Sequence, residues 1–480
     1  MTAKRKEEII VEAITYKDMV FVIGDVEASI YALDLREKAN EHGEIEIMVV
    51  LDEKKKEEVL HDSKEFFSIF YQKEGNIQPL FQGVVTFLEM ITAGEVYYMQ
   101  LRAKTSTYFM DFSPRSQSYQ NTSLLTHDFI SHLMKRQNNS SSLLSIPNNP
   151  VKELVVQYEE TDWEFLKRFV SRYGAFVFVD STRAEVSLQI GCGEQKKDVI
   201  WDHLGYTAKQ NIEECQKRKK KEIAQYDIQY VVSAYDIVPL GAKIVFHGKE
   251  MIIGEIKRSL QQGILLNQYT LFYKEGLIKE KYYNDKLTGC SIYGSVMGVH
   301  RNKVQVRLQI DGEEESKYWF PFSTVAASSD GSGWYCMPKQ GDQVRIFFPV
   351  HDEKEGYAIT CAEGHNPEQA QADDPMGNPN VKDISTPAGN NVKFTENGIE
   401  LSTNGANGQV LLTNDGVIKI NGIDKISFWA GESIKISADK QLNIWADSKV
   451  TVQNDQGAEI VITEDELKIS GTQVHENLPN

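Results

Sequence analysis

The chain has 480 residues, of which 41% are hydrophobic and 10% aromatic, so several domains with separate hydrophobic cores are expected. Its formal net charge of -17 repels phosphate groups, which argues against nucleic acid or an anionic membrane as a partner. Five scattered cysteines without a C-x-x-C pair argue against a disulfide framework and fit a reducing compartment.

Residues 1–120 are expected to form a first β-barrel domain. A charged segment among the strands, residues 53–62, is expected to be a short helix or loop. The N-terminus is charged and has no apolar signal region, and no run of ~18 apolar residues follows, so we expect assembly in the cytoplasm. The strands are expected in IIVEAITY (9–16), MVFVIG (19–24), EIEIMVVL (44–51) and PLFQGVVTFLEM (79–90).

Residues 121–285 combine a helical part with a second set of strands. Apolar residues recur every four positions from Leu125 to Leu133, which predicts one helix. A second helix is expected between the capping box Thr161–Glu164 and the stop signal Gly174. Strands are expected in AQYDIQYVVSAYDI (224–237), AKIVFHG (242–248), MIIGEIKRSL (251–260) and LLNQYTLFYK (265–274).

A basic cluster at residues 217–221 is interpreted as a solvated loop or helix face, with docking of an acidic partner as the alternative. Residues 286–365 contain five short strand patterns and predict a small closed barrel. We expect its aromatic residues to serve packing, although polymer binding is the alternative; they are Trp319, Phe320, Phe322 and Trp334. Residues 366–389, rich in Pro, Asp and Asn, are expected to be a linker.

Residues 390–470 contain an eight-residue repeat that runs through six octads from residue 410. The first and third positions are bulky and apolar and the fifth is small or Asn, and since residues two apart in a strand share a face, each octad predicts a short strand with an apolar side. The corners at 431–433, 439–441 and 447–449 contain a single glycine, which suits gradual solenoid corners better than tight hairpins.

Two coils of one chain would leave most of these apolar side chains in water, because repeat folds need at least ~3 stacked units. Three intertwined chains would bury them on a common axis, so we expect a trimeric β-prism; a single-chain meander stays open as the alternative. The expected trimer core comprises Val410, Ile418, Ile426, Ile434, Ile436, Leu442, Ile444, Val450 and Val452.

Four stretches resemble, in the same order, the VgrG-type spike of contractile injection systems, a relative of the hub and spike of contractile phage tails. They are residues 79–87, 157–180, 238–256 and 318–348. The resemblance implies a mainly β fold with some α: two hub β-barrel-like domains, a small OB-type barrel and a C-terminal intertwined trimeric β-prism, or triple-stranded β-helix. The octads keep the family's period, but Ile is commoner than Val at their first position.

The resemblance implies a structural part of a tail-like particle, delivered outside the cell or into a target when the particle contracts. Its expected partners are two further copies of the chain, a hexameric inner tube protein and baseplate proteins. A small tip protein on the C-terminal end, residues 471–480, and effector cargo are further candidates.

The sequence predicts no catalytic residue, no cofactor and no metal site. It contains neither a G-x-S-x-G elbow nor a phosphate-binding loop, and its ten histidines are dispersed. His127 and His132 are expected on a helix surface, and His475 stands alone in the tail. A trimeric fibre or adhesin that binds a surface receptor or polysaccharide is the alternative, but few residues follow the octads.

Overall fold

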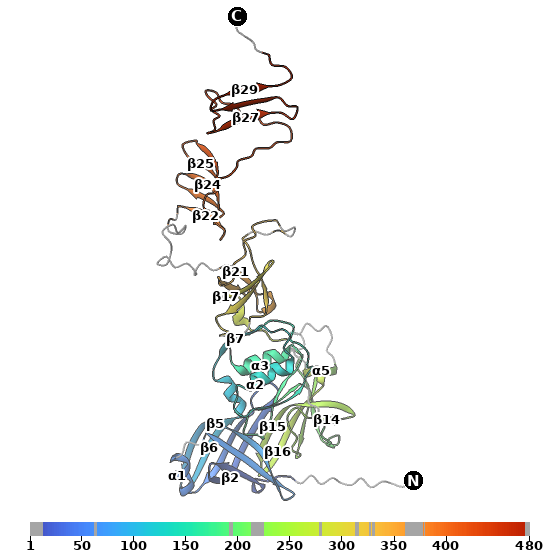
Figure 1. Ribbon diagram of the computed structural model, residues 1–480. Helices are drawn as coiled ribbons and strands as arrows, with labels where there is room; N and C mark the ends of the chain where they lie inside the picture. Colours follow the sequence, from blue (N-terminus) through green and yellow to red (C-terminus); the bar gives the residue numbers. More distant parts are fainter. Residues whose placement is uncertain are drawn as a thin grey trace, which may run out of the picture. The chain divides into compact units, whose positions relative to one another are not determined.

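The computed structural model describes residues 13–61, 65–191, 195–212, 225–277, 281–312, 316–325, 328, 332–360, 378 and 380–475. The chain divides into two compact units, Met1–Gly364 and His365–Asn480 (Figure 1). The basic cluster at 217–221 and most of the expected linker lie outside the described residues.

The first unit begins with a closed antiparallel barrel. Its strands are hydrogen-bonded in the order β1-β4-β5-β6-β3-β2, and β1 also pairs with β2, which closes the barrel. Three of the four expected strands are confirmed. The six strands are β1 (Met19–Ile23), β2 (Val26–Lys38), β3 (Glu44–Leu51), β4 (Phe66–Lys73), β5 (Asn76–Ala93) and β6 (Val96–Lys104).

The expected strand at 9–16 is wrong over its described residues. Thr15 forms a single bridge to Ile264, and Tyr16–Asp18 is a 3-10 turn, η1. The cause is local: the backbone N–H and the hydroxyl of Thr15 both donate to Asp18 Oδ2, at 2.8 and 2.7 Å. This capping box turns the chain before β1 begins.

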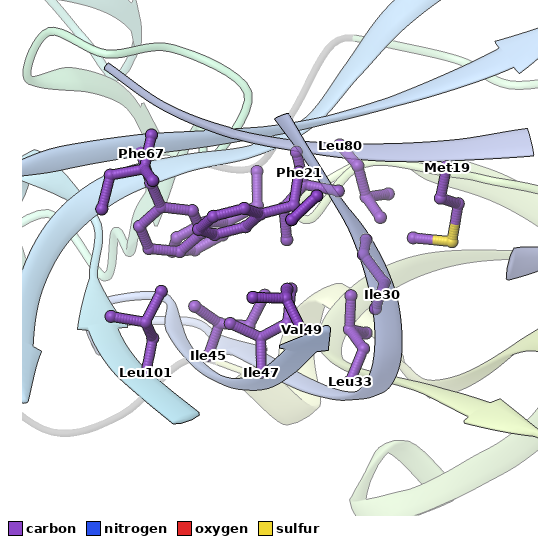
Figure 2. Close-up of a cluster of buried hydrophobic side chains, with 14 of the residues drawn as sticks. Met19, Phe21, Ile30, Leu33, Ile45, Ile47, Val49, Phe67, Leu80 and Leu101 are labelled. Atoms are coloured by element: carbon purple, nitrogen blue, oxygen red, sulfur yellow. The ribbon is translucent and has the colours of Figure 1, made fainter. Parts of the chain in front are cut away.

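The barrel interior is filled by alternating side chains of its strands. Figure 2 shows side chains from opposite walls of the barrel meeting there, among them Phe21 and Phe67 facing Ile47 and Val49. Phe21 and Phe67 stack with their ring centroids 5.2 Å apart. Both rings are buried, so this barrel has a complete core within a single chain.

A second group of strands continues the same sheet. β15 pairs with β2 from Glu255↔Lys38 to Ser259↔Asp34, and the order then runs β15-β16-β13-β12, with β14 on β15. All four strands expected between 224 and 274 are confirmed. The group comprises β12 (Tyr206–Gln210), β13 (Ile228–Ala234), β14 (Lys243–Phe246), β15 (Lys249–Gln261) and β16 (Ile264–Phe272).

Both expected helices of the middle segment are present, as α2 (Thr126–Met134) and α3 (Asp162–Ser171), and the charged segment forms α1 (Glu53–His61). At the start of α3, Thr161 Oγ1 accepts from Glu164 N at 3.1 Å, and Thr161 N donates to Glu164 Oε2 at 3.0 Å, so the capping box is confirmed. Short strands flank the helices: β7 (Arg115–Tyr119), β8 (Ser141–Ser145), β9 (Val155–Glu160), β10 (Val177–Val179) and β11 (Ser187–Gly191).

The small barrel is confirmed as a five-stranded sheet in the order β19-β18-β17-β20-β21. A bridge between Phe322 and Ala358 joins its two ends. Phe320 and Phe322 belong to its core, whereas Trp319 and Trp334 are exposed. Its strands are β17 (Ser291–His300), β18 (Lys303–Leu308), β19 (Trp319–Pro321), β20 (Gln343–Phe347) and β21 (Tyr357–Thr360).

The second unit contains two antiparallel meanders. The first comprises β22 (Lys382–Ser385), β23 (Asn391–Thr395), β24 (Gly398–Thr403), β25 (Gly408–Thr413) and β26 (Ile418–Gly422). The second comprises β27 (Lys449–Gln453), β28 (Glu459–Thr463) and β29 (Leu467–Ser470).

The first two octads therefore differ from the expected gradual winding. They pair with each other as β25 and β26, because Gly416, with φ at 86°, provides a hairpin turn between them. The single-chain meander, left open as an alternative, thus describes these two octads and also the last one, whose strand β27 pairs with β28, but not the three octads between them.

Candidate functional site

The octad segment between the two meanders has a regular shape without a partner strand. Its backbone bends at 423–424, 431–432, 439–440 and 447–448, with straight segments of six residues between the bends. The last three bends fall at the corners expected from the sequence. Within the part of the chain that the structure describes, no strand pairs with residues 423–448. The N–H of Ile423 donates to the carbonyl oxygen of Asn407 at 3.0 Å. Residues 424–448 are described throughout and lie in no strand pair, so their backbone groups are available to another chain.

The apolar side chains of this segment are exposed. Ile434 and Leu442 are each 54% exposed, Ile436 66% and Ile444 71%, and Ile426 is also exposed. The chain brings none of these five together. Three further expected core residues, Val410, Val450 and Val452, lie on strands opposite Ile420, Ile462 and Ile460. The ninth, Ile418, lies opposite Leu412. No part of a single chain that the structure describes thus encloses the expected core.

The whole second unit lacks a core of its own. Among its described residues, Val461 is the single buried apolar side chain. Exposed apolar residues that the sequence analysis did not assign lie before and after the octads, on β22–β24 and on β28–β29. The alternation of apolar and polar residues in β23, β24 and β29 could have identified the residues of these three strands. They are Ile384, Phe394, Ile399, Leu401, Ile460, Ile462, Leu467 and Ile469.

In the first unit, buried charges join the small barrel to the helical part. Arg168 of α3 donates to Glu160 Oε1 at 2.7 Å and to Glu353 Oε1 at 2.5 Å, and Arg172 donates to the same Glu353 oxygen at 2.9 Å. All four side chains are buried. Glu353 lies in the 3-10 turn η5 (Glu353–Glu355), which precedes β21. The small barrel is therefore fixed to α3 by charge-assisted hydrogen bonds.

A second contact of the same kind lies at the end of β18. Asp311 accepts from the backbone N–H and the hydroxyl of Ser118, both at 2.6 Å, and from Gln120 Nε2 at 3.1 Å. Burial raises the pKa of Asp311, although these hydrogen bonds oppose the shift. Neither contact is predictable from the sequence, since the partners lie more than 180 residues apart.

One cluster of titratable side chains in the first unit surrounds His42. His42 Nε2 lies 3.0 Å from Asp111 Oδ2, and its Nδ1 lies 2.8 Å from Thr107 Oγ1. This arrangement resembles a catalytic triad, but the Thr107 side chain is buried, so a substrate cannot reach its hydroxyl. His127 Nε2 lies 2.8 Å from the carbonyl oxygen of Ile146, which ties a loop to α2, while His132 is exposed.

Among the described residues, no group of three or more His, Cys, Asp and Glu side chains is arranged to hold a metal ion. No helix in the described part of the chain is long and apolar enough to cross a membrane.

Comparison with known proteins identifies two segments. Residues 67–209 match the family of the phage tail baseplate hub (GPD), and residues 296–362 match the type VI secretion system/phage-baseplate injector OB domain. No curated protein matches the chain. The two family matches confirm the resemblance to VgrG-type spike proteins.

Solved structures share the fold at low identity. One is the c3393 protein of E. coli, described as a type VI secretion component similar to the T4 tail proteins gp27 and gp5. It is 12% identical at a TM-score of 0.50, covering 70% of this chain and 98% of that one. Another is the half-lidded Francisella PdpA–VgrG complex, which is 9% identical with a TM-score of 0.52. The match covers 84% of this chain and 87% of that one. The match to the lidless PdpA–VgrG complex has the same identity and TM-score, and it covers 84% of this chain and 97% of that one.

Proposed function

We propose that this chain, which resembles baseplate hub and spike proteins of phage tails and type VI secretion systems, assembles as a homotrimer that forms the central hub and the spike of a contractile injection particle. The first unit forms the hub, and the second unit of three chains forms an intertwined β-prism. The trimer acts mechanically and carries no catalytic site.

The observation that carries this proposal is the missing core of the second unit. Exposing so many Ile, Leu, Val, Phe and Trp side chains costs roughly 25 cal/mol for each Å² of apolar surface. A surface of this extent on a soluble protein marks an interaction site. Three copies wound about one axis would bury the inward side chains and pair the backbone groups of 424–448, which lie in no strand pair within the chain. The eight-residue bends support this winding, since each turns the chain without forming a hairpin.

The hub supports a mount on a hexameric tube. Each chain contributes two groups of barrel strands, so three chains present six such groups to a ring of six subunits. The outer face of β5 offers apolar contacts for neighbouring subunits through Phe87 and Ile91, which are exposed on the chain. Baseplate proteins, a small tip protein at the C-terminal end and effector cargo complete the proposed set of partners.

The buried charge contacts between α3 and the small barrel suit a part that transmits force. When a sheath contracts and drives the tube forward, the load passes from the hub through the small barrel to the prism. A joint that depends on Glu353 and Asp311 in buried positions resists bending better than a flexible linker.

Sedimentation of the purified chain tests the assembly directly. We expect a species of three times 54.5 kDa at micromolar concentration. A chain that stays at 54.5 kDa over this range would reject the proposal. Mixing the trimer with the tube protein of the same particle, and imaging the product, tests the mount: the trimer should cap tubes at one end only.

A further inference from the structure

Two tryptophans of the octad segment have no part in the proposed trimer core. Trp429 and Trp445 are 89% and 81% exposed. Both occupy the fourth octad position, between the inward third and fifth positions, so they point outward in a strand. The other fourth positions are polar: Thr413, Asn421, Ser437 and Gln453. Two large aromatic side chains at outward positions of a polar column require a reason other than packing.

The octad period fixes where these tryptophans lie in the trimer, and this inference therefore rests on the proposed function. Each octad carries a chain through a third of a turn and one strand spacing, ~4.8 Å, along the axis. The next strand on the same face then belongs to another chain and to the following octad. Residues at equal octad positions form one column on each face. Trp429, Ser437 and Trp445, each from a different chain, follow one another in that column.

The column offers two flat apolar surfaces, which are the indole rings of Trp429 and Trp445. The indoles are separated by two strand spacings, ~10 Å, and the small Ser437 leaves the space between them open. The neighbouring outward column, at the second octad position, places Ser427, Lys435 and Asn443 beside them. Aromatic faces flanked by hydrogen-bonding side chains suit a ligand that is apolar on one face and polar at its rim.

The charge of the segment narrows the ligand further. Residues 410–457 contain six acidic and five basic side chains, so the prism surface is nearly neutral although the whole chain is acidic. A strongly charged polymer would gain little from such a surface. A ligand that is neutral along its contact face, rigid and extended fits both the charge and the straight column.

We propose that each face of the spike binds an extended β-(1→4)-linked polysaccharide. Successive sugars of such a chain are turned over, so the same ring face recurs at every second sugar. Each sugar advances the chain by about one strand spacing, and two sugars therefore span the separation of the indoles. The apolar faces of alternate rings stack on Trp429 and Trp445, and their hydroxyls bond to Ser427 and Asn443.

A membrane surface is the competing partner for exposed tryptophans, but the column fits it poorly. Interfacial tryptophans gather at one depth of a bilayer. Here the two indoles are separated along the spike axis by a serine and flanked by Lys, Ser and Asn rather than by apolar residues. The spike would pass through the polysaccharide of an envelope, and the column would hold the polymer along the shaft.

The test uses the full chain and three insoluble or vesicular probes: chitin, an α-(1→4)-glucan and phosphatidylcholine vesicles. We expect the wild-type trimer to sediment with chitin and with neither of the other two. The double variant W429S/W445S gives both tryptophan positions the serine that Ser437 already has in the same column. It should weaken chitin binding about tenfold or more. The variant S437W/W445S keeps two tryptophans but halves their spacing, and it should lose binding as the double variant does.

Equal chitin binding by the wild type and the spacing variant would overturn the proposal, because it would show unspecific adhesion. Binding to vesicles without binding to chitin would overturn it in favour of a membrane. The assembly is followed by sedimentation in parallel. A wild-type trimer that binds no chitin rejects only this inference, whereas a wild-type monomer rejects the proposed function itself.

Discussion

At the scale of single residues, several charged side chains that join parts of the fold are buried. In the sequence they cannot be distinguished from charged surface residues. The chain is 25% charged, so nothing in its pattern separates Glu353 from its exposed neighbour Glu355. Only the fold brings Glu353 to Arg168 and Arg172. By contrast, the capping box at Thr161 lies within four residues, and its chemistry is readable without the fold. Local signals are therefore predictable, and long-range charge pairs are not.

Glu353→Gln tests the joint between α3 and the small barrel. The amide keeps the shape of the side chain but removes the negative charge between two buried guanidinium groups. Breaking a buried pair in this way costs ~3 kcal/mol or more, because the remaining charges are left uncompensated. We expect this loss in the free energy of unfolding of the first unit, measured by urea denaturation of the full chain.

The matched control for this change is Glu355→Gln, two residues away in the same turn. Its side chain is exposed, so we expect a change within about 0.5 kcal/mol. Equal stability of the two variants would mean that the joint does not depend on the charge of Glu353.

The pair formed by Asp111 and His42 predicts a pH dependence. Burial alone would raise the pKa of Asp111, but hydrogen bonds from His42 and Thr161 outweigh it and hold the pKa below the ordinary range. A carboxyl with a lowered pKa stabilises the fold above its unfolded pKa, ~3.9, and this contribution is lost as the pH falls through the folded value.

Asp111→Asn should therefore lower the melting temperature by a few degrees at pH 7, and the difference from the wild type should narrow as the pH falls below ~4. Thermal melting at pH 7, 5, 4 and 3 measures it. Asp34→Asn, at an exposed ion pair with Arg36, serves as the control and should show no such trend. If the melting temperatures of Asp111→Asn and the wild type differ by the same amount at all four pH values, the lowered pKa of Asp111 does not contribute to stability.

At the scale of elements, the sequence predicts strands well where one face is buried and the other is polar. EIEIMVVL (44–51) alternates over its first half, continues as an apolar run, and forms β3 with the expected bounds. β2 was not recognised, because its outward positions include Tyr31 and Ala32 and an irregular pairing between Ile30 and Ala32 interrupts the alternation. The order of the strands could not be predicted at all, since barrel closure depends on pairing across the whole domain.

In the octads, the eight-residue pattern alone does not predict which strands pair with each other. Two octads flank Asn414-Asp415-Gly416 and form a hairpin, whereas those joined by corners without a residue at positive φ form none. This difference in turn chemistry thus determines which octads pair within the chain, and the unpaired octads are the ones that the proposed prism would pair with other chains. The eight-residue period predicts where the chain bends. The glycine at positive φ determines which octads form a hairpin.

Ile436→Asp tests which face of the octads points inward. In the proposed prism it places three carboxylates together on a dry axis, where their desolvation and mutual repulsion oppose assembly. We expect sedimentation to show only monomer at micromolar concentration. Ser437→Asp is the matched control, because the adjacent position points outward, and it should remain trimeric. A trimeric Ile436→Asp variant would place this residue in water.

At the scale of the whole molecule, the two units depend on assembly to different degrees. The first has barrels with complete cores, including one built around Phe21 and Phe67, so it should fold as a single chain. The second has a single buried apolar side chain among its described residues and should acquire its core only from other copies. In the proposed trimer, the first unit should thus fold in one step and the second unit should wind in another, and we expect the winding to hold the three chains together.

The exchange of subunits between trimers tests this division. Intertwined strands must unwind before a chain can leave, so full-length trimers carrying two different labels should exchange over hours or more. A fragment ending at Gly364 keeps the hub and the small barrel but no octads, and it should exchange at least about tenfold faster or remain monomeric at the same concentration. Fluorescence energy transfer after mixing measures both rates. Equal rates for the two proteins would mean that the hub, and not the octad segment, holds the three chains together.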